Sequence, residues 1–358
     1  MPKVVIDLRM VRGRLHGISR YALELSRRLP ALAPDLEFIG LASPDGLPDD
    51  LGPLTPSFPI TRCRAHFLSP FEQPALALSL GQAKPDLFHA TSFSLPALWP
   101  GRLVATLHDA NHLAMPEQYG PGRVTYYRVV VGPRAKRARA LVTDSEFSRE
   151  EVARHLGLNP YKLQIIPLGV DARFTPPTQG ELAEFRRRRG LPERYFAAVG
   201  STKAHKNLEL IADLAPALPA PVALLAGRDA KAELGFPDST LELANLSEEE
   251  MPLFYGGATA LLLPSRYEGF GLPALEAMAS GCPVIAARAG SLPEVVGEAG
   301  VLARPDDANA WREEATALFR DERHRRALVE KGLERAGRFT WDACAQQTLA
   351  VYRRALEA

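Results

Sequence analysis

The chain has 358 residues, of which 46% are hydrophobic, and its formal net charge is +1 at pH 7. This length and apolar content suit two domains, each with its own core, and the nearly balanced charge excludes the strongly basic character of a general nucleic-acid-binding protein. The three cysteines, Cys63, Cys282 and Cys344, lack the spacing of metal ligands, and their odd number does not suit a disulfide framework. We therefore expect a protein of a reducing compartment.

The charge is unevenly distributed along the chain. Residues 1–170 carry 20 Lys and Arg against 15 Asp and Glu, whereas the remainder carries 23 against 27. A basic N-terminal half could approach an anionic membrane surface, although ordinary scatter of surface charge explains the same numbers. No apolar run reaches the roughly 20 residues that span a bilayer, and the start MPKVVIDLR indicates a strand rather than a signal peptide. We expect a cytoplasmic protein whose membrane contact, if any, is peripheral and at the inner face.

Short apolar runs alternate with helical patterns along the whole chain. In the first half the predicted strands are Val4–Leu8, Glu37–Ala42, Leu87–Ala90, Leu103–Leu107, Leu141–Thr143 and Leu163–Ile166. In the second half they are Tyr195–Val199, Val222–Ala226, Leu241–Leu243, Ala260–Leu263, Val284–Ala287 and Val301–Ala303. Many of these runs are apolar without alternation, which is typical of parallel strands buried on both faces. Two successive series of this kind predict an α/β fold with two doubly wound, Rossmann-like domains.

The break between the two series falls at residues 167–180, PLGVDARFTPPTQG, whose prolines and glycines suit a linker. We place the N-terminal domain at residues 1–170 and the C-terminal domain at residues 171–340. Ligands of doubly wound sheets bind beyond the carboxyl ends of the strands. Site residues are therefore expected in the segments that follow the predicted strands.

Three segments of the first domain carry residues of interest. Residues 9–21, RMVRGRLHGISRY, contain Gly17, where a bare backbone could approach a ligand, and Ser19, which suits a helix N-cap. His108 follows a strand in VATLHDA; an isolated histidine is often structural, but this location favours a site residue. The segment 123–139 is helical in pattern and rich in arginine, and a solvated face is a better interpretation of it than an acceptor-binding or membrane-binding face.

Residues 200–207, GSTKAHKN, follow the first predicted strand of the second domain. Lys203 and Lys206 lie beside a glycine turn and a predicted helix start at Asn207. Such a helix start offers free backbone N–H groups, and together with the cations it attracts a diphosphate. A surface lysine is the alternative for Lys206 alone; in this context we favour phosphate binding.

Residues 268–276, EGFGLPALE, form the most informative pattern in the chain. A glycine turn and Pro273 separate Glu268 from Glu276, which predicts a loop followed by the first turn of a helix, with Glu276 in that turn. Free N–H groups and carboxylates, which accept hydrogen bonds from vicinal hydroxyls, suit a polyhydroxyl or anionic ligand. The alternative, a helix cap with two exposed acids, explains either glutamate alone but not the two glycines and Phe270 together.

The segment EGFGLPALE at 268–276 resembles the donor-site signature of family-4 glycosyltransferases. AMASGCPVIA at 277–286 and GSLPEVVGEAGVL at 290–302 resemble the rest of the donor domain of that family. The glycine loop around Gly17, His108-Asp109 and GVDARF at 169–174 are similar to further segments of the family. The resemblance covers nearly the whole chain.

The resemblance implies a GT-B fold, in which an acceptor-side N-terminal domain and a donor-binding C-terminal domain face each other across a cleft. It also implies that the final helix, residues 341–358, crosses back to the first domain. The implied activity is that of a retaining glycosyltransferase, which uses a nucleotide-diphosphate sugar.

The resemblance further implies roles for individual residues. The catalytic residues it implies are His108, which contacts the donor sugar, Lys206, which binds the phosphates, and Glu268, which lies near the sugar. The donor-binding residues it implies are Gly17, Ser201, Lys203, Lys206, Glu268, Gly269, Phe270, Gly271, Leu272 and Glu276. Glu276 binds the nucleotide ribose in this scheme. The family often has an arginine at the Ser201 position, so we expect the second cation of the phosphate site to come from Lys203, His205 or Arg228.

Some glycosyltransferases hold a metal with an Asp-x-Asp pair, which this sequence lacks. A lysine and a helix start can stabilise the departing diphosphate instead, so we expect an enzyme that requires neither a metal nor a cofactor. The similarity is strongest to bacterial mannosyltransferases of polysaccharide synthesis. It favours GDP-mannose as the donor over UDP-glucose or UDP-N-acetylglucosamine, and it implies a glycan or lipid-linked acceptor.

Two other classes of protein remain compatible with the sequence. A nucleotide-sugar epimerase can share the GT-B architecture and needs no acceptor, and a catalytically silent binding subunit is compatible with Ser201. The sequence lacks the G-x-x-x-x-G-K-[ST] phosphate loop, the G-x-S-x-G nucleophile elbow and H-E-x-x-H. Its early glycines do not fit the G-x-G-x-x-G of a nicotinamide site.

Overall fold

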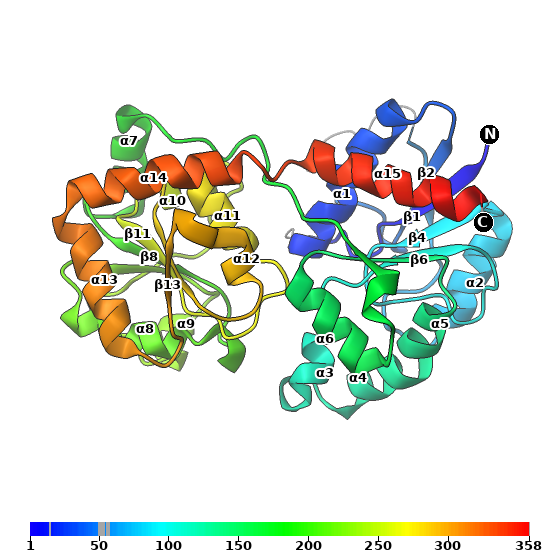
Figure 1. The fold of residues 1–358 in the computed structure, drawn as a ribbon, viewed down its shortest axis with the longest axis horizontal. Helices are drawn as coiled ribbons and strands as arrows, with labels where there is room; N and C mark the ends of the chain where they lie inside the picture. The colour runs from blue at the N-terminus through cyan, green and yellow to red at the C-terminus, as the bar shows by residue number, and fades with distance from the viewer. Residues whose placement is uncertain (14–15, 49–53, 55–57, 358) are drawn as a thin grey trace. The chain divides into compact units, whose positions relative to one another are not determined.

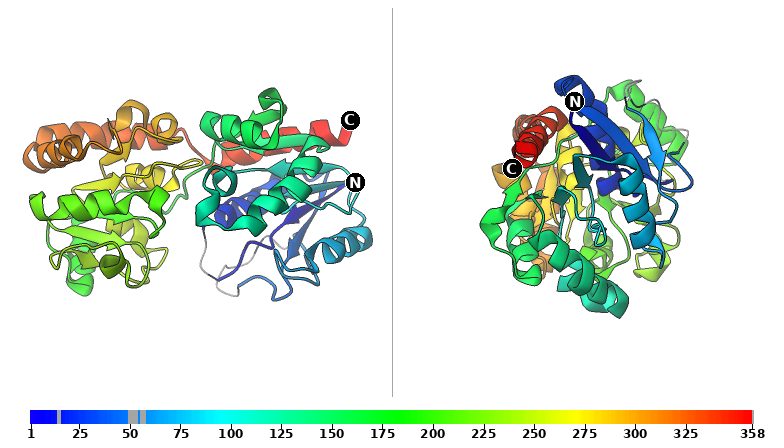
Figure 2. Two further views of the ribbon diagram at one scale, coloured as in Figure 1. Left: turned by 90° about the horizontal axis from the view of Figure 1, so that it is seen from below. Right: turned by 90° about the vertical axis from the view of Figure 1, so that its right-hand side faces the viewer.

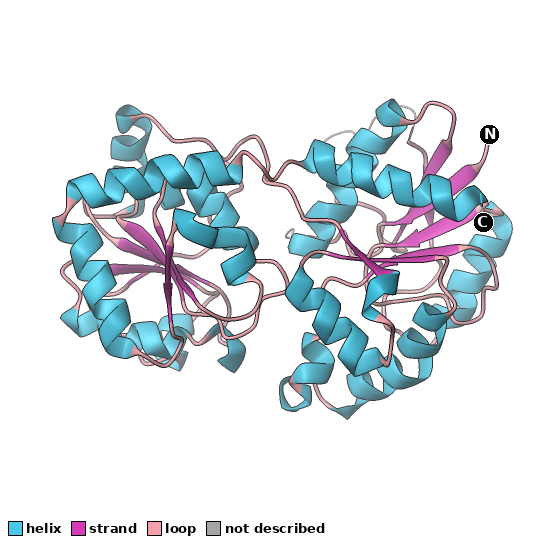
Figure 3. Cartoon of the chain, in the orientation of Figure 1, coloured by secondary structure: helices cyan, strands magenta, loops and turns pink. Residues whose placement is uncertain are grey.

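The structure is a computed structural model that describes residues 1–13, 16–48, 54 and 58–357. The chain forms two compact units (Figure 1). The N-terminal unit consists of Met1–Gly169 with Trp341–Ala358, and the C-terminal unit is Val170–Thr340. Each unit is a β-sheet flanked by helices (Figure 3). Among the helices in the described part of the chain, none combines the length and the apolar character needed to cross a membrane.

The sheet of the N-terminal unit has seven strands. They are β1 (Lys3–Asp7), β2 (Glu37–Ala42), β3 (Ile60–Arg62), β4 (Leu87–Ala90), β5 (Leu103–Thr106), β6 (Ala140–Thr143) and β7 (Leu163–Ile165). Their order is β3-β2-β1-β4-β5-β6-β7, and every pair of neighbours is parallel. The carboxyl ends of β1, β4, β5 and β6 therefore share one edge of the sheet, and the segments that follow them lie close together.

Helices cover both faces of this sheet. They are α1 (Gly17–Leu32), α2 (Glu72–Ala83), α3 (Asn111–Ala114), α4 (Pro121–Tyr126), α5 (Gly132–Lys136), α6 (Glu146–Leu156) and α15 (Trp341–Glu357). One hydrophobic core joins α2, α5 and α6 to sheet residues such as Val5 and Phe88. The final helix α15, red in Figure 2, packs against α1 and contacts β4 and β5, which confirms the predicted return of the C-terminus to the first domain.

The C-terminal unit has a six-stranded parallel sheet. Its strands are β8 (Phe196–Val199), β9 (Val222–Leu225), β10 (Leu241–Glu242), β11 (Ala260–Leu263), β12 (Val284–Ala287) and β13 (Val301–Ala303), in the order β10-β9-β8-β11-β12-β13. Its helices are α7 (Gln179–Arg189), α8 (Leu208–Leu214), α9 (Ala230–Glu233), α10 (Glu250–Gly256), α11 (Leu272–Ala279), α12 (Leu292–Val296), α13 (Ala308–Arg320) and α14 (Glu322–Ala336). Because β8 and β11 are neighbours, the loops that follow them lie side by side.

Thr178 and Glu181 define where the linker ends. The Thr178 hydroxyl accepts a hydrogen bond from the Glu181 backbone, and the Glu181 carboxylate accepts one from the Thr178 backbone. This reciprocal capping box starts α7 inside the segment predicted as linker.

The structure differs from the predictions in several local features. Strand β3 was not predicted, because its three residues are not buried and form no apolar run. The arginine-rich helix of residues 123–139 is instead α4 and α5 joined by a π-helical turn, η3 (Tyr127–Val131). The N-cap of α1 is His16 rather than Ser19, whose hydroxyl donates to the Met10 carbonyl at 2.7 Å. That bond ties α1 to the segment after β1 instead of capping the helix.

Candidate functional site

The loop between β11 and α11 contains the residues of the predicted donor segment. Gly271 is the N-cap of α11 and has a φ of 102°, a left-handed conformation that favours glycine. A Cβ atom at Gly271 would lie 2.8 Å from a methyl carbon of Leu292, so the position also lacks room for a side chain. No side chain caps this helix start. In its first turn Pro273 has no N–H, and the N–H groups of Ala274 and Leu275 donate to the Gly271 carbonyl at 3.0 and 3.4 Å.

Gly290 and Ser291 hold this loop from the neighbouring segment after β12. The Ser291 hydroxyl lies 2.7 Å from the Phe270 carbonyl and 2.9 Å from the Glu268 carbonyl, and the Ser291 N–H donates to the Glu268 carbonyl at 3.1 Å. Gly290 has a φ of 59°, and a Cβ atom there would lie 2.8 Å from the Glu268 nitrogen. The close approach of the two backbones fixes where Glu268 stands.

The side chain of Phe270 anchors the loop by packing into the protein interior. It is buried, and its ring makes an edge-to-face contact with Phe339, with the ring centroids 5.8 Å apart. Such a contact adds to the hydrophobic stabilisation of the loop. The side chain thus anchors the loop, while Gly269 beside it is partly exposed. Any donor contact at Phe270 must come from its backbone.

Lys206 and Glu268 form an ion pair although they are 62 positions apart. The Lys206 Nζ atom lies 2.7 Å from Glu268 Oε1, and the two side chains are 22% and 11% exposed. Lys206 ends the short helix η5 (Ala204–Lys206) after β8, and Glu268 belongs to the loop after β11. Two of the predicted catalytic residues are thereby brought together at the carboxyl edge of one sheet.

Asn207 fixes the backbone next to Lys206. It has a φ of 53°, and its side-chain amide donates to the Pro264 carbonyl at 3.1 Å and to the Pro305 carbonyl at 2.9 Å. These bonds join the segments that follow β8, β11 and β13. The predicted helix start at Asn207 is confirmed as the N-cap of α8, which begins at Leu208.

His205 is buried beside Lys206. Burial and the neighbouring charge of Lys206 lower the pKa of His205 to about 4, which favours a neutral ring. The expectation that Lys203, His205 or Arg228 supplies the second cation stays a prediction, and this pKa makes His205 the less favourable choice. Ser201 and Lys203 lie in the turn between β8 and η5, and Lys203 is exposed.

Glu276 lies one turn deeper in α11 than predicted. It is the fifth residue of the helix, so the expected place in the first turn is wrong. The side chain is buried, and the Tyr255 hydroxyl of α10 reaches Glu276 Oε2 at 3.4 Å. An ionised carboxylate only accepts hydrogen bonds, so hydroxyl groups are suitable partners for it.

The N-terminal unit holds Gly17 and His108 near the carboxyl edge of its own sheet. Gly17 is the first residue of α1, and Tyr21 of the same helix makes an edge-to-face contact with the His108 ring at 4.9 Å. Residues 14 and 15 of the same glycine loop are outside the described part of the chain. The start of α1 and His108 are therefore neighbours, as the prediction of one site at this edge requires.

Both ring nitrogens of His108 are engaged. Nδ1 lies 2.6 Å from Asp144 Oδ2, and Nε2 lies 3.0 Å from the Thr91 carbonyl oxygen. Burial alone would lower the pKa of His108, but the Asp144 charge and hydrogen bond, with the Thr91 carbonyl, outweigh it and raise the pKa above its ordinary value. Because both neighbours are acceptors, a ring with N–H groups at both nitrogens satisfies them, and this geometry favours the imidazolium form.

His89, on the neighbouring strand β4, has the opposite character. Its Nδ1 lies 2.5 Å from the Tyr352 hydroxyl of α15, and its Nε2 lies 2.8 Å from the Thr106 hydroxyl. Full burial, with the charge of His108, lowers the pKa of His89 to about 3. His89 is therefore a neutral, structural histidine that connects the final helix to the sheet.

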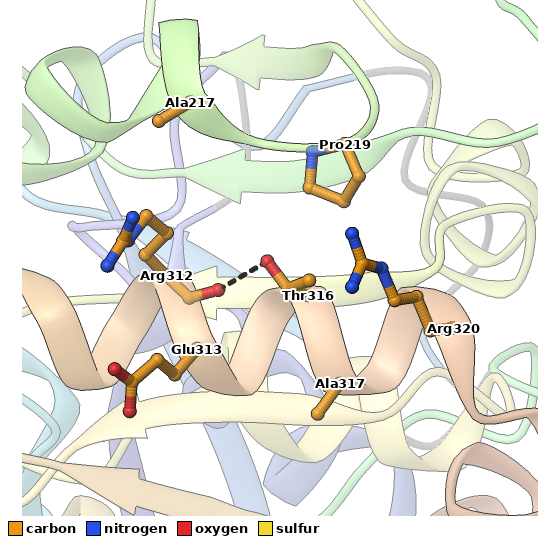
Figure 4. A pocket seen from close by; sticks show the side chains of 7 residues that line it. All are labelled: Ala217, Pro219, Arg312, Glu313, Thr316, Ala317 and Arg320. Carbon is orange, nitrogen blue, oxygen red and sulfur yellow. Dashed lines mark hydrogen bonds between the residues drawn. The ribbon is translucent and has the colours of Figure 1, made fainter.

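The described residues show no metal centre, and a pocket lies elsewhere in the C-terminal unit. No group of three or more His, Cys, Asp or Glu among them is arranged to hold a metal ion. A pocket of about 650 Å³ lies along α13 (Figure 4), where Thr316 donates to the Arg312 carbonyl at 2.7 Å. None of the predicted site residues belongs to the described lining of this pocket.

The individual contacts that position the site were missed by sequence reasoning. Asp144 as the partner of His108, Asn207 as a bridge between strands, and Ser291 as a clamp on the donor loop all depend on segments distant in sequence. The GSLPEVVGEAGVL segment was identified only through its resemblance. Of this segment, the structure explains the first two residues, Gly290 and Ser291, because both contact the backbone of the donor loop.

Two doubly wound parallel sheets, with a glycine-opened helix start beside a lysine–glutamate pair, define a GT-B glycosyltransferase. Comparison with protein families agrees. Residues 15–174 match the family described as "Glycosyltransferase Family 4", and residues 182–335 match "Glycosyl transferases group 1". The chain belongs to the family-4 glycosyltransferases and is a sugar-transferring enzyme.

Similar proteins include mannosyltransferases and D-inositol 3-phosphate glycosyltransferases. The chain is 28% identical to the O-antigen chain mannosyltransferase B of Escherichia coli, over 98% of this chain and 99% of that protein. It is 34% identical to the MMP alpha-(1->4)-mannosyltransferase of Mycolicibacterium hassiacum, over 62% of this chain and 56% of that protein. Among solved structures, the sucrose-phosphate synthase of Thermosynechococcus elongatus has a similar fold, with a TM-score of 0.80, 20% identity and 99% of both chains covered.

Proposed function

We propose that this enzyme transfers mannose from GDP-mannose to a glycan or lipid-linked acceptor, with retention of the anomeric configuration and without a metal. The observation that carries the donor site is the Lys206–Glu268 ion pair beside the glycine-opened start of α11. The mannosyltransferase relatives support the choice of mannose. UDP-glucose and UDP-N-acetylglucosamine are the alternative donors.

In this proposal each donor group meets a residue suited to it. The Lys206 ammonium and backbone N–H groups of the loop bind the diphosphate, since an anion is stabilised by both. Glu276 accepts hydrogen bonds from the ribose hydroxyls. Glu268 and the 269–272 backbone bind hydroxyls of the sugar. When the diphosphate binds, Lys206 exchanges part of its contact with Glu268 for the phosphate, which leaves the glutamate for the sugar.

The proposed reaction is a same-face substitution. The bond between C1 of the sugar and the diphosphate oxygen breaks, and the acceptor oxygen forms the new bond to C1 on the same face. The acceptor hydroxyl proton passes to the departing diphosphate. Lys206 stabilises the charge that develops on this leaving group, which is the largest contribution a metal-free site can make. His108, paired with Asp144, lies at the carboxyl edge of the sheet of the N-terminal unit and is the residue proposed to contact the sugar.

The experiment that tests this function separates it from the two alternatives. Each nucleotide sugar is incubated with the enzyme, with and without a mixture of glycan and lipid-linked acceptors, and the release of nucleoside diphosphate and the identity of the sugar are measured. Acceptor-dependent release from GDP-mannose is the expected result. Conversion of the donor sugar to its epimer without an acceptor would identify an epimerase, and nucleotide binding without turnover would identify a silent subunit.

A further inference from the structure

Two adjoining pockets occur on the helical face of the N-terminal unit. One, of about 640 Å³, lies among α3, η3, α5 and α6. The other, of about 690 Å³, lies between the segment before β5 and the end of α5. Arg137 lines both. We call the two pockets together the basic groove.

The basic groove is defined by cations. Its arginine and lysine residues are Arg102, Arg128, Arg134, Lys136, Arg137 and Arg139. No Asp or Glu occurs among the described residues that line it. The sequence explains this, since residues 118–143 contain six Arg and Lys and no acidic residue. The surface therefore presents a positive potential that nearby carboxylates do not cancel.

Another arginine-rich helix of the same chain is built differently. Residues 186–189 of α7 are four consecutive arginines, but Arg187 pairs with Glu184 at 2.8 Å, and Arg188 and Arg189 pair with Glu250. In the basic groove, by contrast, His155 is the lining residue with an acidic partner among the described residues, Glu151 at 3.6 Å. Carboxylates thus neutralise the arginines of α7, whereas the described arginines that line the basic groove have no such partner.

Exposed apolar side chains accompany the groove. Leu98, which lines the second pocket, is 63% exposed, and Val129, next to Arg128, is 68% exposed. Val129 belongs to the π-helical turn η3, a rare geometry that is frequent at functional sites. Pro133, four positions on, is also exposed and lines the first pocket. Large apolar side chains surrounded by cations are a poor match for water but a good match for a lipid interface.

We propose that the basic groove docks the enzyme on an anionic lipid bilayer. The exposed side chains of Arg128, Lys136, Arg137 and Arg139 contact headgroup phosphates, and Leu98 and Val129 enter the interface between headgroups and acyl chains. Arg134 is buried and donates instead to the Pro96 and Gly101 carbonyls, so it supports the groove from below. The second pocket lies at the amino ends of β5 and β6, next to Arg102 and Ala140, and so opposite to the edge that holds His108. Docking there leaves the site edge of the same sheet uncovered. The inference does not depend on the donor, because it concerns binding to lipid without nucleotide sugar.

Vesicle sedimentation tests the proposal with the whole chain. Wild-type protein is expected to bind vesicles of phosphatidylglycerol, to bind phosphatidylcholine vesicles weakly, and to lose binding as salt rises. The variant Arg128→Gln/Arg137→Gln should bind phosphatidylglycerol roughly 10- to 30-fold more weakly, since each basic residue near an anionic surface contributes about fivefold. The matched control Arg187→Gln/Arg188→Gln removes the same charge from α7 and should bind like wild type. Unchanged thermal unfolding of both variants shows that they are folded.

Trp99 reports whether the groove itself meets the lipid. It lines the second pocket and is partly exposed, whereas Trp311 and Trp341 are 1% and 2% exposed. Brominated phosphatidylglycerol should quench the fluorescence of the wild type, and Trp99→Phe should abolish the quenching without reducing vesicle binding. Equal binding by the groove variant and wild type, or vesicle binding without quenching of Trp99, would overturn the proposal. Binding to a soluble polyanion such as heparin but not to vesicles would also overturn it.

Discussion

Lys206 and Glu268 meet at 2.7 Å on the edge of one sheet, and this contact carries most of the proposed donor chemistry. An ammonium held by a carboxylate is already oriented before the diphosphate arrives. Preorganisation of this kind lowers the cost of binding, because the side chain does not have to be ordered by the ligand. The pair therefore links phosphate binding to the placement of the sugar carboxylate.

Replacement of Lys206 should reveal this link. We expect Lys206→Met to weaken nucleoside diphosphate binding roughly 10- to 100-fold, since the loss of one charge-assisted hydrogen bond costs about 1.5–3 kcal/mol. Isothermal titration calorimetry measures the affinity for the nucleoside diphosphate in the wild type, Lys206→Met, Glu268→Gln and the double variant. The effects should not add, because the two residues contact each other. Lys231→Met, which removes a lysine elsewhere in the C-terminal unit, is the control, and loss of affinity in that variant alone would contradict the assignment.

His108 should set the alkaline side of the pH profile. Its raised pKa means that the imidazolium persists above the ordinary pKa of histidine and is lost as pH rises through the folded-state value. Transferase activity should therefore fall on the alkaline side. Asp144→Asn removes the main group that raises the pKa, so it should shift this fall to lower pH, as measured by kcat/KM against pH. An identical profile in the variant would show that the charge of His108 has no role.

At the scale of elements, most of the fold could be predicted and most of the site contacts could not. The strands of apolar sequence, such as β2 and β11, could be predicted, because an apolar run between turn residues already indicates a parallel strand. The three-residue strand β3 gave no such run. The π-helical turn η3 could not be predicted either, since its sequence has an ordinary helical pattern.

The donor segment shows the same division. The spacing of glycines and Pro273 in 268–276 indicated a loop and a helix start, and both are present. Which carbonyls the Ser291 hydroxyl reaches depends on the packing of residues 21 and 23 positions apart. Local sequence patterns carry no information about such distances.

Gly290 gives a prediction at this scale. Gly290→Ala should destabilise the enzyme by about 1–3 kcal/mol and raise the KM for the donor, because the added Cβ meets the Glu268 backbone at 2.8 Å. Gly281→Ala is the matched control, since Gly281 also has a positive φ, of 74°, but its nearest contact is a proline side chain at 3.4 Å. Denaturant unfolding and donor KM measure the two effects. A donor KM that rises equally in both variants would mean that Gly290 acts only through stability.

At the scale of the whole molecule, each unit contributes its own residues to the proposed reaction. The C-terminal unit holds the phosphate and sugar residues, and the N-terminal unit holds Gly17, His108 and the basic groove. The hydrogen bond between Tyr352 of α15 and His89 of β4 helps to hold the last helix in the N-terminal unit. The chain therefore passes from one unit to the other twice, at residues 169–170 and 340–341.

The stereochemistry of the product tests the proposed same-face substitution. The donor carries its sugar in the α-configuration, so retention should give an α-linked product. Proton NMR of the initial product, recorded before any equilibration, distinguishes the two anomers. A β-linked product would contradict the proposed mechanism while leaving the donor site intact.

The most direct test of the donor site is a thermal-shift measurement with GDP, UDP, ADP and dTDP, each with and without magnesium, on the wild type and Glu276→Ala. A ligand that binds only the folded protein raises its apparent stability by mass action. We predict that GDP raises the melting temperature of the wild type, that magnesium does not change the rise, and that Glu276→Ala abolishes it. No rise with any nucleotide at saturation, or an equal rise in the variant, would contradict the assignment of the donor site.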